Sequence, residues 1–166
     1  VVQASYEVDI PFIVPESLVI QNFEDGVTLS TFNFGGASAG IIVANPDPSG
    51  ENTTANVFEF NKPEGAQVWA GSGFTIDVLE FNDQTSFQLK SYSPEVGKVI
   101  KVKLETDQGN VAGLTHEVDV VTTVANEWET LVYDFSEAPD LEYVSFIVFY
   151  DFGNSAGGTY RLDEIQ

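Results

Sequence analysis

Cysteine and methionine are absent from this sequence of 166 residues, and histidine occurs once. Without cysteine the chain forms no disulfide bond and offers no thiolate for a metal or a nucleophile. The single histidine, His116, shares a strand face with Val118 and Val120, which predicts a packed side chain rather than a base. Ser-His-Asp catalysis stays formally open, but we expect no nucleophile elbow. Any bound metal is therefore expected to be a hard cation with oxygen ligands.

Basic residues are also scarce, with 6 Lys and Arg against 26 Asp and Glu and a formal charge of −20. This balance disfavours nucleic acid, whose phosphates attract Lys and Arg, and it disfavours an anionic membrane surface. It suits a neutral or cationic partner, divalent cations, or a saline habitat in which salt screens the repulsion. The sequence is 43% apolar, so it is not a disordered acidic tail, and no apolar run is long enough to predict membrane insertion.

The length of the chain predicts one domain with a substantial core. The alternating run 6–10, followed by Pro11 and Pro15, indicates an edge strand or a linker from an upstream region over residues 1–17. We expect residues 18–166 to form the folded domain. The missing methionine at position 1 favours a processed or excised piece of a longer chain.

Helical periodicity is missing, and short apolar runs separated by Gly, Asn, Asp and Pro follow one another along the chain. Val, Ile, Thr, Phe and Tyr dominate these runs, and apolar and polar residues often alternate. Ile100, Val102 and Leu104, for example, are expected to face the core, while Lys101 and Lys103 face outward. We predict strands over residues 57–60, 74–79, 87–92, 99–104, 116–124, 128–135, 143–152 and 160–165. Many short strands of this kind predict an antiparallel β-sandwich.

One predicted strand, residues 143–152, is apolar on both faces. In one interpretation it is a central strand that other elements cover on both sides. In the other, one face fills the core and the opposite face lines a ligand groove with aromatic rings. The sequence leaves both interpretations open.

Two acidic segments lie at opposite ends of the predicted domain. Residues 22–26 carry Glu24 beside an apolar residue and a turn, and residues 160–165 carry Asp163 in a similar setting. If the first and last strands lie side by side, the two carboxylates can share one hard cation such as calcium. Carboxylates gathered at strand ends repel one another unless a cation neutralises them. The alternative is that both are solvated turn acids.

An ordered series of segments resembles a known type of domain. The residues that carry the resemblance are the loop 45–57, Val68-Trp69-Ala70-Gly71, residues 91–94, 103–105, 128–131 and 134–136, and the two end segments. Over residues 18–166 the series resembles the jelly-roll carbohydrate-binding modules of secreted polysaccharide-degrading enzymes and surface glycan-binding proteins of Bacteroidota. In architecture these are similar to carbohydrate-binding module families 4, 16 and 22.

The resemblance implies an all-β antiparallel β-sandwich, a jelly roll of the galactose-binding-like type, with a structural calcium ion. In such modules an acidic residue after the first strand and an Asp in the last strand often share the ion, and these positions match Glu24 and Asp163. The loop 45–52 is expected to add a ligand from Asn52, from Asp47 or from a main-chain carbonyl group.

Sugar binding needs aromatic rings that stack on pyranose faces and polar side chains that bind hydroxyl groups. Trp69 has small neighbours, Gly71 and Gly73, which leave its ring accessible as a stacking platform. The alternative is a tryptophan that covers the rim of the core. Trp128 matches a structural tryptophan of the resembled modules and is expected to be buried.

A polar row on the predicted strand 87–92 is a second candidate surface. Gln88, Lys90 and Tyr92 share one face of this strand, and the row ends in an aromatic ring, as a sugar groove requires. A solvated sheet face shows the same pattern. Four of the six basic residues lie on this strand and the following hairpin, where they pair with carboxylates or contact an acidic sugar.

We expect a non-catalytic carbohydrate-binding module that binds a polysaccharide and raises the substrate concentration around a linked catalytic or surface-binding domain, in an extracellular or cell-surface location. The expected ligand is a neutral β-glucan such as laminarin or a mixed-linkage glucan, because a charge of −20 repels sulfated or uronic polymers. Two alternatives remain. One is a glycoside hydrolase or lyase acting on β-glucan, since hydrolysis needs only a pair of carboxylates, and the other is a structural or adhesion spacer without a glycan ligand.

Overall fold

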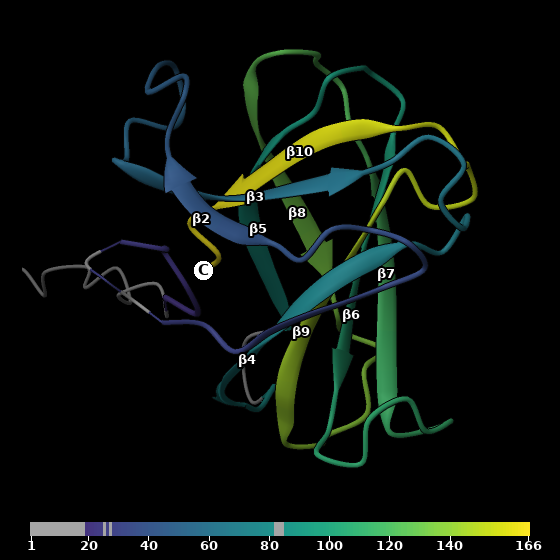
Figure 1. Cartoon of the computed structure of the whole chain (residues 1–166). Helices are drawn as coiled ribbons and strands as arrows, with labels where there is room; N and C mark the ends of the chain where they lie inside the picture. Colours follow the sequence, from purple (N-terminus) through teal and green to yellow (C-terminus); the bar gives the residue numbers. More distant parts are fainter. Residues whose placement is uncertain (1–18, 25, 27, 82–84) are drawn as a thin grey trace, which may run out of the picture.

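The computed structural model describes residues 19–24, 26, 28–81 and 85–166, and this part of the chain forms ten strands in two five-stranded antiparallel sheets (Figure 1). The predicted linker over residues 1–17 lies outside the described residues. Within the described part, no helix is long and apolar enough to cross a membrane. The predicted all-β antiparallel β-sandwich of the jelly-roll type is confirmed.

The first sheet places the doubly apolar strand at its centre. Its strands are β1 (Thr31–Phe34), β4 (Gly71–Leu79), β6 (Val99–Glu105), β7 (Thr115–Val121) and β9 (Tyr143–Tyr150). They are arranged in the order β1-β4-β9-β6-β7, and each neighbouring pair is antiparallel. Because β9 lies between β4 and β6, both of its edges are paired and both of its faces are available for packing.

The second sheet has the last strand of the chain at its centre. Its strands are β2 (Ile41–Ala44), β3 (Asn56–Lys62), β5 (Ser86–Tyr92), β8 (Trp128–Asp134) and β10 (Gly158–Asp163). Their order is β2-β3-β10-β5-β8, so that β10 pairs with β3 on one side and with β5 on the other (Figure 1).

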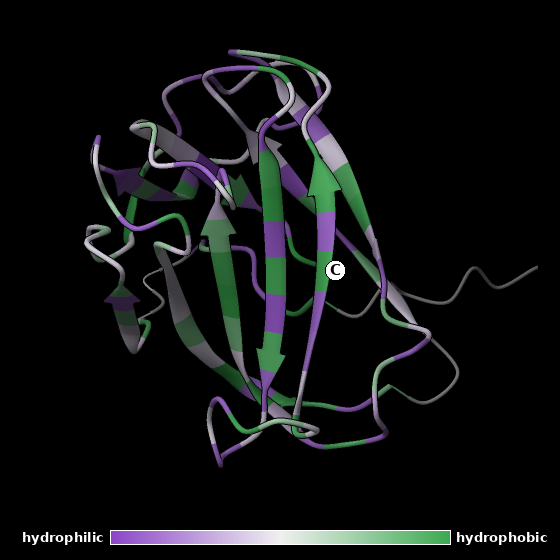
Figure 2. Ribbon diagram, turned by 90° about the vertical axis from the view of Figure 1, so that its right-hand side faces the viewer, coloured by the Kyte–Doolittle hydropathy of each residue, from purple (hydrophilic) through white to green (hydrophobic). Residues whose placement is uncertain are grey.

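The core lies between the two sheets and follows the alternation of the sequence. Ile100, Val102 and Leu104 are buried in it, as predicted. The two sheets meet through aromatic contacts, for example between Phe60 and Tyr150, whose ring centroids lie 4.1 Å apart. Apolar and polar residues alternate along several strands in Figure 2, as expected for sheets with one face in the core.

The two ends of the described chain lie side by side through an isolated bridge, whereas the first strand, β1, lies in the other sheet from β10. Gln21 and Ile165 form an antiparallel bridge, in which Ile165 N donates to Gln21 O at 2.8 Å. Ile20 N also donates to Ile165 O at 2.8 Å. This pairing sets the segment that carries Glu24 next to the end of β10, which carries Asp163.

The strands predicted from the sequence all occur, but some end earlier and two were missed. The predicted strand 143–152 ends at Tyr150, because Asp151 has a φ of 47° and leaves the extended conformation. The predicted strand 160–165 ends at Asp163 for the same reason, since Glu164 has a φ of 41°. The strands β1 and β2, of four residues each, were not predicted.

Two buried tyrosines provide a matched test of the core. The Tyr133 hydroxyl donates to Ile100 O at 3.1 Å, from one sheet to the other. For the Tyr150 hydroxyl, no described residue offers a hydrogen-bond partner. Tyr133→Phe is therefore expected to cost about 1 kcal/mol, or about 2–4 °C in Tm, while Tyr150→Phe leaves Tm unchanged or higher. Thermal denaturation measures both, and an equal loss in the two variants would contradict this description of the core.

Candidate functional site

An aromatic surface lines a hollow of about 340 Å³ on the outer face of the first sheet. Its floor consists of Ile147 and Phe149 from β9 and of Phe32 and Phe34 from β1. Trp69, in the connection between β3 and β4, lies over Phe34 with the ring centroids 6.2 Å apart and the ring planes 14° from parallel. The Trp69 side chain is supported from below yet 45% exposed. We call this surface the aromatic hollow.

Two glycines of β4 make room for the phenylalanine rings. The strand register pairs Gly71 with Phe34 and Gly73 with Phe32. A Cβ atom on Gly71 would lie 2.7 Å from Cζ of Phe34, and one on Gly73 would lie 2.6 Å from Cζ of Phe32. Each ring therefore lies flat over the bare backbone of the neighbouring strand. These glycines therefore make room for two rings of the floor of the hollow.

A polar wall completes the aromatic hollow. Lys103 Nζ donates to Asn110 Oδ1 at 2.6 Å and lies 2.9 Å from Glu105 Oε1, and all three side chains line the hollow. Because these groups hold one another in place, they present fixed donors and acceptors beside the aromatic rings. An apolar platform next to fixed polar groups is an arrangement that suits a sugar, which has apolar ring faces and hydroxyl edges.

The ion pairs of the wall continue onto the outer face of β7. Lys101 Nζ lies 2.9 Å from Glu117 Oε2 and 3.3 Å from Asp119 Oδ1, and Lys103 Nζ lies 3.6 Å from Glu117 Oε1. Burial disfavours the charged form of Lys101, but its pairing with Glu117 and Asp119 raises its pKa overall. Burial likewise opposes ionisation of Glu117, yet Lys101 and Lys103 lower its pKa. With Glu105, two cations face three carboxylates, so the wall carries no surplus positive charge.

The polar row predicted on residues 87–92 lies elsewhere. Gln88, Lys90 and Tyr92 are on β5 of the second sheet and point away from the core, as predicted, but the structure does not bring them together with Trp69. Lys90 lies 3.5 Å from Glu51 Oε2. On this side of the molecule a second hollow, of about 740 Å³, is mainly polar. Its acidic side chains are Asp47, Glu51, Glu127 and Glu129.

The aromatic residues on this second face are largely covered. Tyr92 packs edge-on against Trp128 with the centroids 5.4 Å apart, and the guanidinium carbon of Arg161 lies 5.4 Å from the Tyr92 ring centre. Trp128 is buried, as predicted, and its Nε1 donates to Asp47 O at 2.9 Å. The loop that contains Asp47 thus covers Trp128, and the second hollow offers much less free aromatic surface than the first.

A fully buried carboxylate, Asp163, ends β10. Its Oδ2 accepts a hydrogen bond from Asn52 Nδ2 at 2.9 Å and contacts Thr54 Oγ1, and its Oδ1 accepts one from Glu164 N at 2.8 Å. Thr54 Oγ1 also lies 2.6 Å from Asn52 Oδ1 and 3.4 Å from Asn56 O. The threonine hydroxyl has one proton, whereas three acceptor oxygens surround it. The three oxygens around Thr54 Oγ1 therefore have fewer donors than they can accept from, and a proton or a cation among them would be stabilising.

The electrostatics of Asp163 lead to the same conclusion. Burial raises the pKa of Asp163, and the hydrogen bonds from Thr54, Asn52 and Glu164 only partly oppose this rise. No described Lys or Arg forms an ion pair with Asp163. Either a proton on the carboxylate or a bound cation relieves the shortage of charge.

Glu24 contacts the same loop segment, residues 52–56, as Asp163 does. Glu24 Oε1 accepts from Asn56 N at 2.7 Å, and its Oε2 accepts from Asn56 Nδ2 at 3.3 Å. Three of the residues predicted to bind a metal, Glu24, Asn52 and Asp163, are thus gathered around residues 52–56. Asp47, the other candidate from the loop, has different partners: its Oδ1 accepts from Ser49 Oγ and its main-chain oxygen accepts from Trp128 Nε1.

The backbone is strained on both sides of this group. Phe23, just before Glu24, has a φ of 57°, and Glu164, just after Asp163, has a φ of 41°. Such conformations cost about 1–3 kcal/mol each and are often found at functional sites. Among the described residues, no three or more His, Cys, Asp or Glu side chains are arranged to hold a metal. A cation here would therefore need amide, hydroxyl or carbonyl oxygens besides the two carboxylates.

One pentapeptide of the form G-x-S-x-G does occur, at residues 36–40. Ser38 is exposed in the connection between β1 and β2, and its Oγ lies 3.1 Å from both N and O of Asn61. His116 lies on β7 of the first sheet, with its ring 5.4 Å from that of Phe135. A nucleophile elbow needs a strand-to-helix turn and a histidine base, and this loop lies between two strands.

The comparisons with solved structures found carbohydrate-binding modules. The family 11 module of the cellulase Lic26A-Cel5E of Clostridium thermocellum aligns with a TM-score of 0.60 at 16% identity over 89% of this chain and 91% of that module. The family 11 module from Clostridium thermocellum in complex with a β-1,3-1,4-mixed-linked tetrasaccharide aligns with a TM-score of 0.59 at 14% identity, over 90% and 95% of the two chains. A point variant of a family 29 module, in complex with cellulohexaose, aligns with a TM-score of 0.56 at 14% identity, over 89% and 87%.

At these identities the likeness establishes the fold. No protein-family profile matches the sequence, and no curated protein sequence does either. The structural neighbours named above are β-sandwich carbohydrate-binding modules of families 11 and 29.

The contact between the Phe34 ring and the backbone of Gly71 can be tested by adding a Cβ atom at Gly71. A Cβ atom there would lie 2.5 Å from Val148 O and 2.7 Å from the Phe34 ring, so Gly71→Ala is expected to cost about 1–3 kcal/mol and to lower Tm by several degrees. The emission of Trp69 should change too, because Phe34 supports its ring. Ser72→Ala is the control, since the hydroxyl of Ser72 has no partner among the described residues. Unchanged stability in Gly71→Ala would contradict the close contact between Phe34 and Gly71.

Proposed function

We propose that this chain is a non-catalytic carbohydrate-binding module whose ligand, a neutral β-glucan, lies in the aromatic hollow. The observation that carries the proposal is the exposed ring of Trp69 beside the floor of Phe34 and Phe149 and the wall of Lys103 and Glu105. Trp69 and Phe32 are the exposed rings of the hollow, and exposed apolar groups rimmed by polar residues mark ligand or partner sites. A volume of about 340 Å³ fits ligand sites, which begin at about 300 Å³.

Charge supports a neutral ligand. The two lysines at the wall are paired with carboxylates, so neither is free to meet the charge of a uronic or sulfated sugar. The overall charge of −20 adds repulsion at low salt. Two of the structurally similar modules carry a mixed-linked tetrasaccharide or cellulohexaose, and both of these are neutral β-glucans. Laminarin and mixed-linkage glucan are therefore our preferred ligands.

A binding role rather than catalysis is favoured by the acids in the hollow. Glu105 is the one carboxylate among its lining residues, and it is paired with Lys103. Glycoside hydrolysis ordinarily uses two carboxylates on either side of the scissile bond. By this proposal the domain is extracellular or at the cell surface, where it keeps a linked enzyme or a glycan-uptake protein of Bacteroidota near its polysaccharide.

Affinity electrophoresis against laminarin, mixed-linkage glucan, xylan, mannan, alginate and chitin tests the proposal. We expect retardation by the β-glucans and none by alginate. Trp69→Ala should raise Kd at least tenfold, a loss of about 1.4 kcal/mol, and should move Tm little because the ring is half exposed. Release of reducing ends from soluble glucan would favour a hydrolase, and a folded protein that no glycan retards would favour a spacer.

Variants in the second sheet test whether glycan binds at the aromatic hollow or at the polar row on β5. Lys90→Ala and Tyr92→Ala alter the outer face of β5 without touching the aromatic hollow. We expect both variants to bind β-glucan within twofold of the parent. Loss of binding in these variants, with full binding by Trp69→Ala, would move the site to the polar row on β5.

A structural calcium ion at Glu24, Asn52 and Asp163 is the second part of the proposal. Calcium prefers six to eight oxygen ligands. Two carboxylates lie at this segment, together with the oxygens of Asn52 and Thr54 and the main-chain oxygen of Asn56. The charge shortage around Thr54 Oγ1 and the raised pKa of Asp163 both support a cation there.

The difference in stability between the parent and Asp163→Asn is expected to change sign when calcium is added. In EDTA the pKa of Asp163 is raised by folding, so its ionised form destabilises the folded state increasingly as pH rises from about 3.9 towards the raised value. At pH 7 in EDTA, Asp163→Asn should therefore be as stable as the parent or more stable. With calcium at 100 times Kd the parent should gain about 2.7 kcal/mol, or about 5–11 °C in Tm, and overtake the variant.

Two controls separate site binding from screening of the acidic surface. Magnesium at the same concentration screens charge equally and should stabilise far less. Asp107→Asn, at an exposed acid in the loop after β6, should respond to calcium like the parent. An equal response of the parent and Asp163→Asn would contradict the calcium site.

A further inference from the structure

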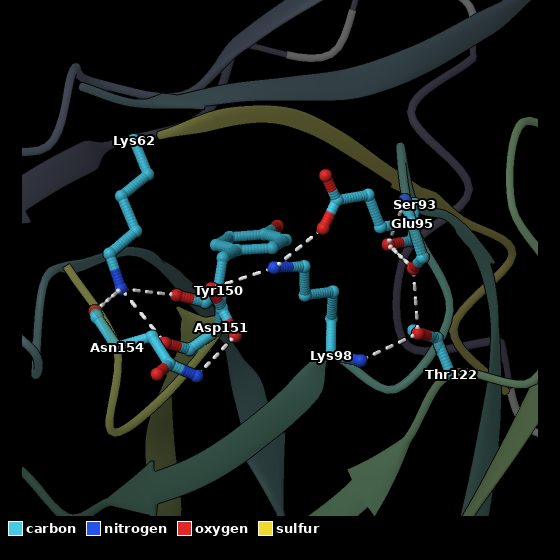
Figure 3. Close-up of polar contacts among 8 residues, drawn as sticks. All are labelled: Lys62, Ser93, Glu95, Lys98, Thr122, Tyr150, Asp151 and Asn154. Carbon is cyan, nitrogen blue, oxygen red and sulfur yellow. Dashed lines mark hydrogen bonds and ion pairs between the residues drawn. The ribbon is translucent and has the colours of Figure 1, made fainter. Parts of the chain in front are cut away.

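A buried lysine joins the two sheets behind the aromatic hollow. Lys62 is the last residue of β3, and its side chain is 0% exposed. Its Nζ donates to three main-chain oxygens, those of Tyr150 at 2.7 Å, Asp151 at 2.9 Å and Asn154 at 2.7 Å. All three belong to the end of β9 or to the turn that follows it, as Figure 3 shows.

The geometry requires that Lys62 be an ammonium ion. Three carbonyl oxygens surround Nζ, and only the protonated amine has three N–H donors for them. Burial lowers the pKa of Lys62, and the nearby Asp151 opposes that effect. The Lys62 ammonium group therefore binds three main-chain oxygens at this turn, as a bound metal cation could do.

The turn at residues 151–154, whose main-chain oxygens bind Lys62, has unfavourable backbone conformations that these hydrogen bonds help to hold. Asp151 has a φ of 47° although it is not glycine, and Gly153 has a φ of 91°. The side chain of Asp151 is itself held, since Oδ1 accepts from Asn154 Nδ2 at 2.9 Å and Oδ2 lies 3.2 Å from Lys98 Nζ (Figure 3). With Lys62 on its carbonyl groups and Lys98 on its carboxylate, the turn is fixed from two sides.

This turn contacts the aromatic hollow at two points. Gly153 N donates to Val68 O at 2.9 Å, which ties the turn to the residue just before Trp69. Phe152 packs edge-on against Phe149 with the ring centroids 5.6 Å apart, and Phe149 belongs to the floor. A displacement of the turn would therefore reach both the stacking ring and the floor beneath it.

We propose that Lys62 is a positioning residue for glycan binding, because its ammonium group fixes the 151–154 turn that holds Trp69 and Phe149 in place. This inference rests on the proposed function of the aromatic hollow. Lys62 itself is buried in the sandwich and touches no ligand there. It acts through the main chain of the turn, whose hydrogen bond to Val68 sets where the Trp69 ring lies.

The test uses a parent protein with Trp128→Phe, so that Trp69 is the single tryptophan of the chain. Lys62→Met keeps the length of the side chain and removes the three donors. We expect this variant to bind mixed-linkage glucan at least tenfold more weakly. Its Trp69 emission should shift to longer wavelength and be quenched more by acrylamide, because the ring leaves Phe34. Lys62→Arg, which keeps the charge and several donors, should restore part of the affinity.

A control variant with similar loss of stability distinguishes positioning from mere destabilisation. Leu131→Ala removes a buried side chain of β8 in the second sheet. It should lower Tm as Lys62→Met does, but leave the affinity within twofold and the Trp69 emission unshifted. The proposal is overturned if Lys62→Met loses only Tm and keeps the parent's affinity and quenching.

A pair of glycine variants keeps the proposal testable if Lys62→Met does not fold. An added Cβ meets nothing within 4 Å at Gly153 or at Gly50, and both residues have positive φ, so each alanine variant strains only its own backbone. Gly153→Ala should weaken binding and expose Trp69 to acrylamide, whereas Gly50→Ala, in the loop between β2 and β3, should do neither. Equal behaviour of the two would also overturn the proposal.

Failure of the positioning role and failure of the glycan-binding function give different results. If no glycan binds the parent protein, the proposed function fails, but acrylamide quenching of Trp69 in Lys62→Met still decides whether the lysine positions the ring. If the parent binds glucan and Lys62→Met matches it in affinity and quenching, only the positioning role fails.

Discussion

The structure depends on a central strand, β9, that is apolar on both faces. Its inner face belongs to the core, through Phe146 and Val148. Its outer face would expose Ile147 and Phe149 to water, yet both are buried, because rings from β1 and Trp69 lie around them. Burial of apolar area is the main favourable term in folding, so this outer cluster stabilises the first sheet. Trp69 lies at the edge of this cluster, and its side chain is half exposed.

Several otherwise unconnected features serve this outer face. The glycines of β4 give the rings of β1 a flat seat, and the ion pairs of β6 and β7 cover its other side with polar groups. The turn after β9, fixed by Lys62, joins the floor to the segment before Trp69. The pairing of Gln21 with Ile165 closes the sandwich at a different place, where the buried Asp163 lies. The proposed ligand site and the candidate cation site are thus separate in the fold.

The sequence predicted much of the fold because alternation along a strand follows directly from having one face in the core. It also named Glu24 and Asp163, which both contact residues 52–56, and singled out Trp69, which lies at the aromatic hollow. It could not show which distant strands pair, and so it could not show which candidate residues lie on the same sheet. Gln88, Lys90 and Tyr92 have the pattern of a sugar-binding row, but β5 pairs with β10 and β8 in the other sheet, which no local pattern reveals.

One interpretation of residues 143–152 placed aromatic rings of that strand, which include Phe149, in a ligand groove, but the two phenylalanines of β1 were missed. Phe32 and Phe34 look like core residues, because phenylalanine has no polar group and is mostly buried. The available signal was Gly71-Ser72-Gly73, since paired glycines within a strand mark a place where something approaches the backbone closely. The role of Lys62 has no such signal, because a lysine at the end of a strand is usually solvated and its partners lie 88 or more residues away.

The most direct test of the central claim is an NMR titration of the amide resonances with a mixed-linkage tetrasaccharide. The account predicts that the shifted resonances gather at residues 32–34, 69–73, 103–110 and 147–149, which surround the aromatic hollow. Shifts confined to residues 47–51 and 123–130, around the second hollow, or no shifts at millimolar sugar, would contradict it.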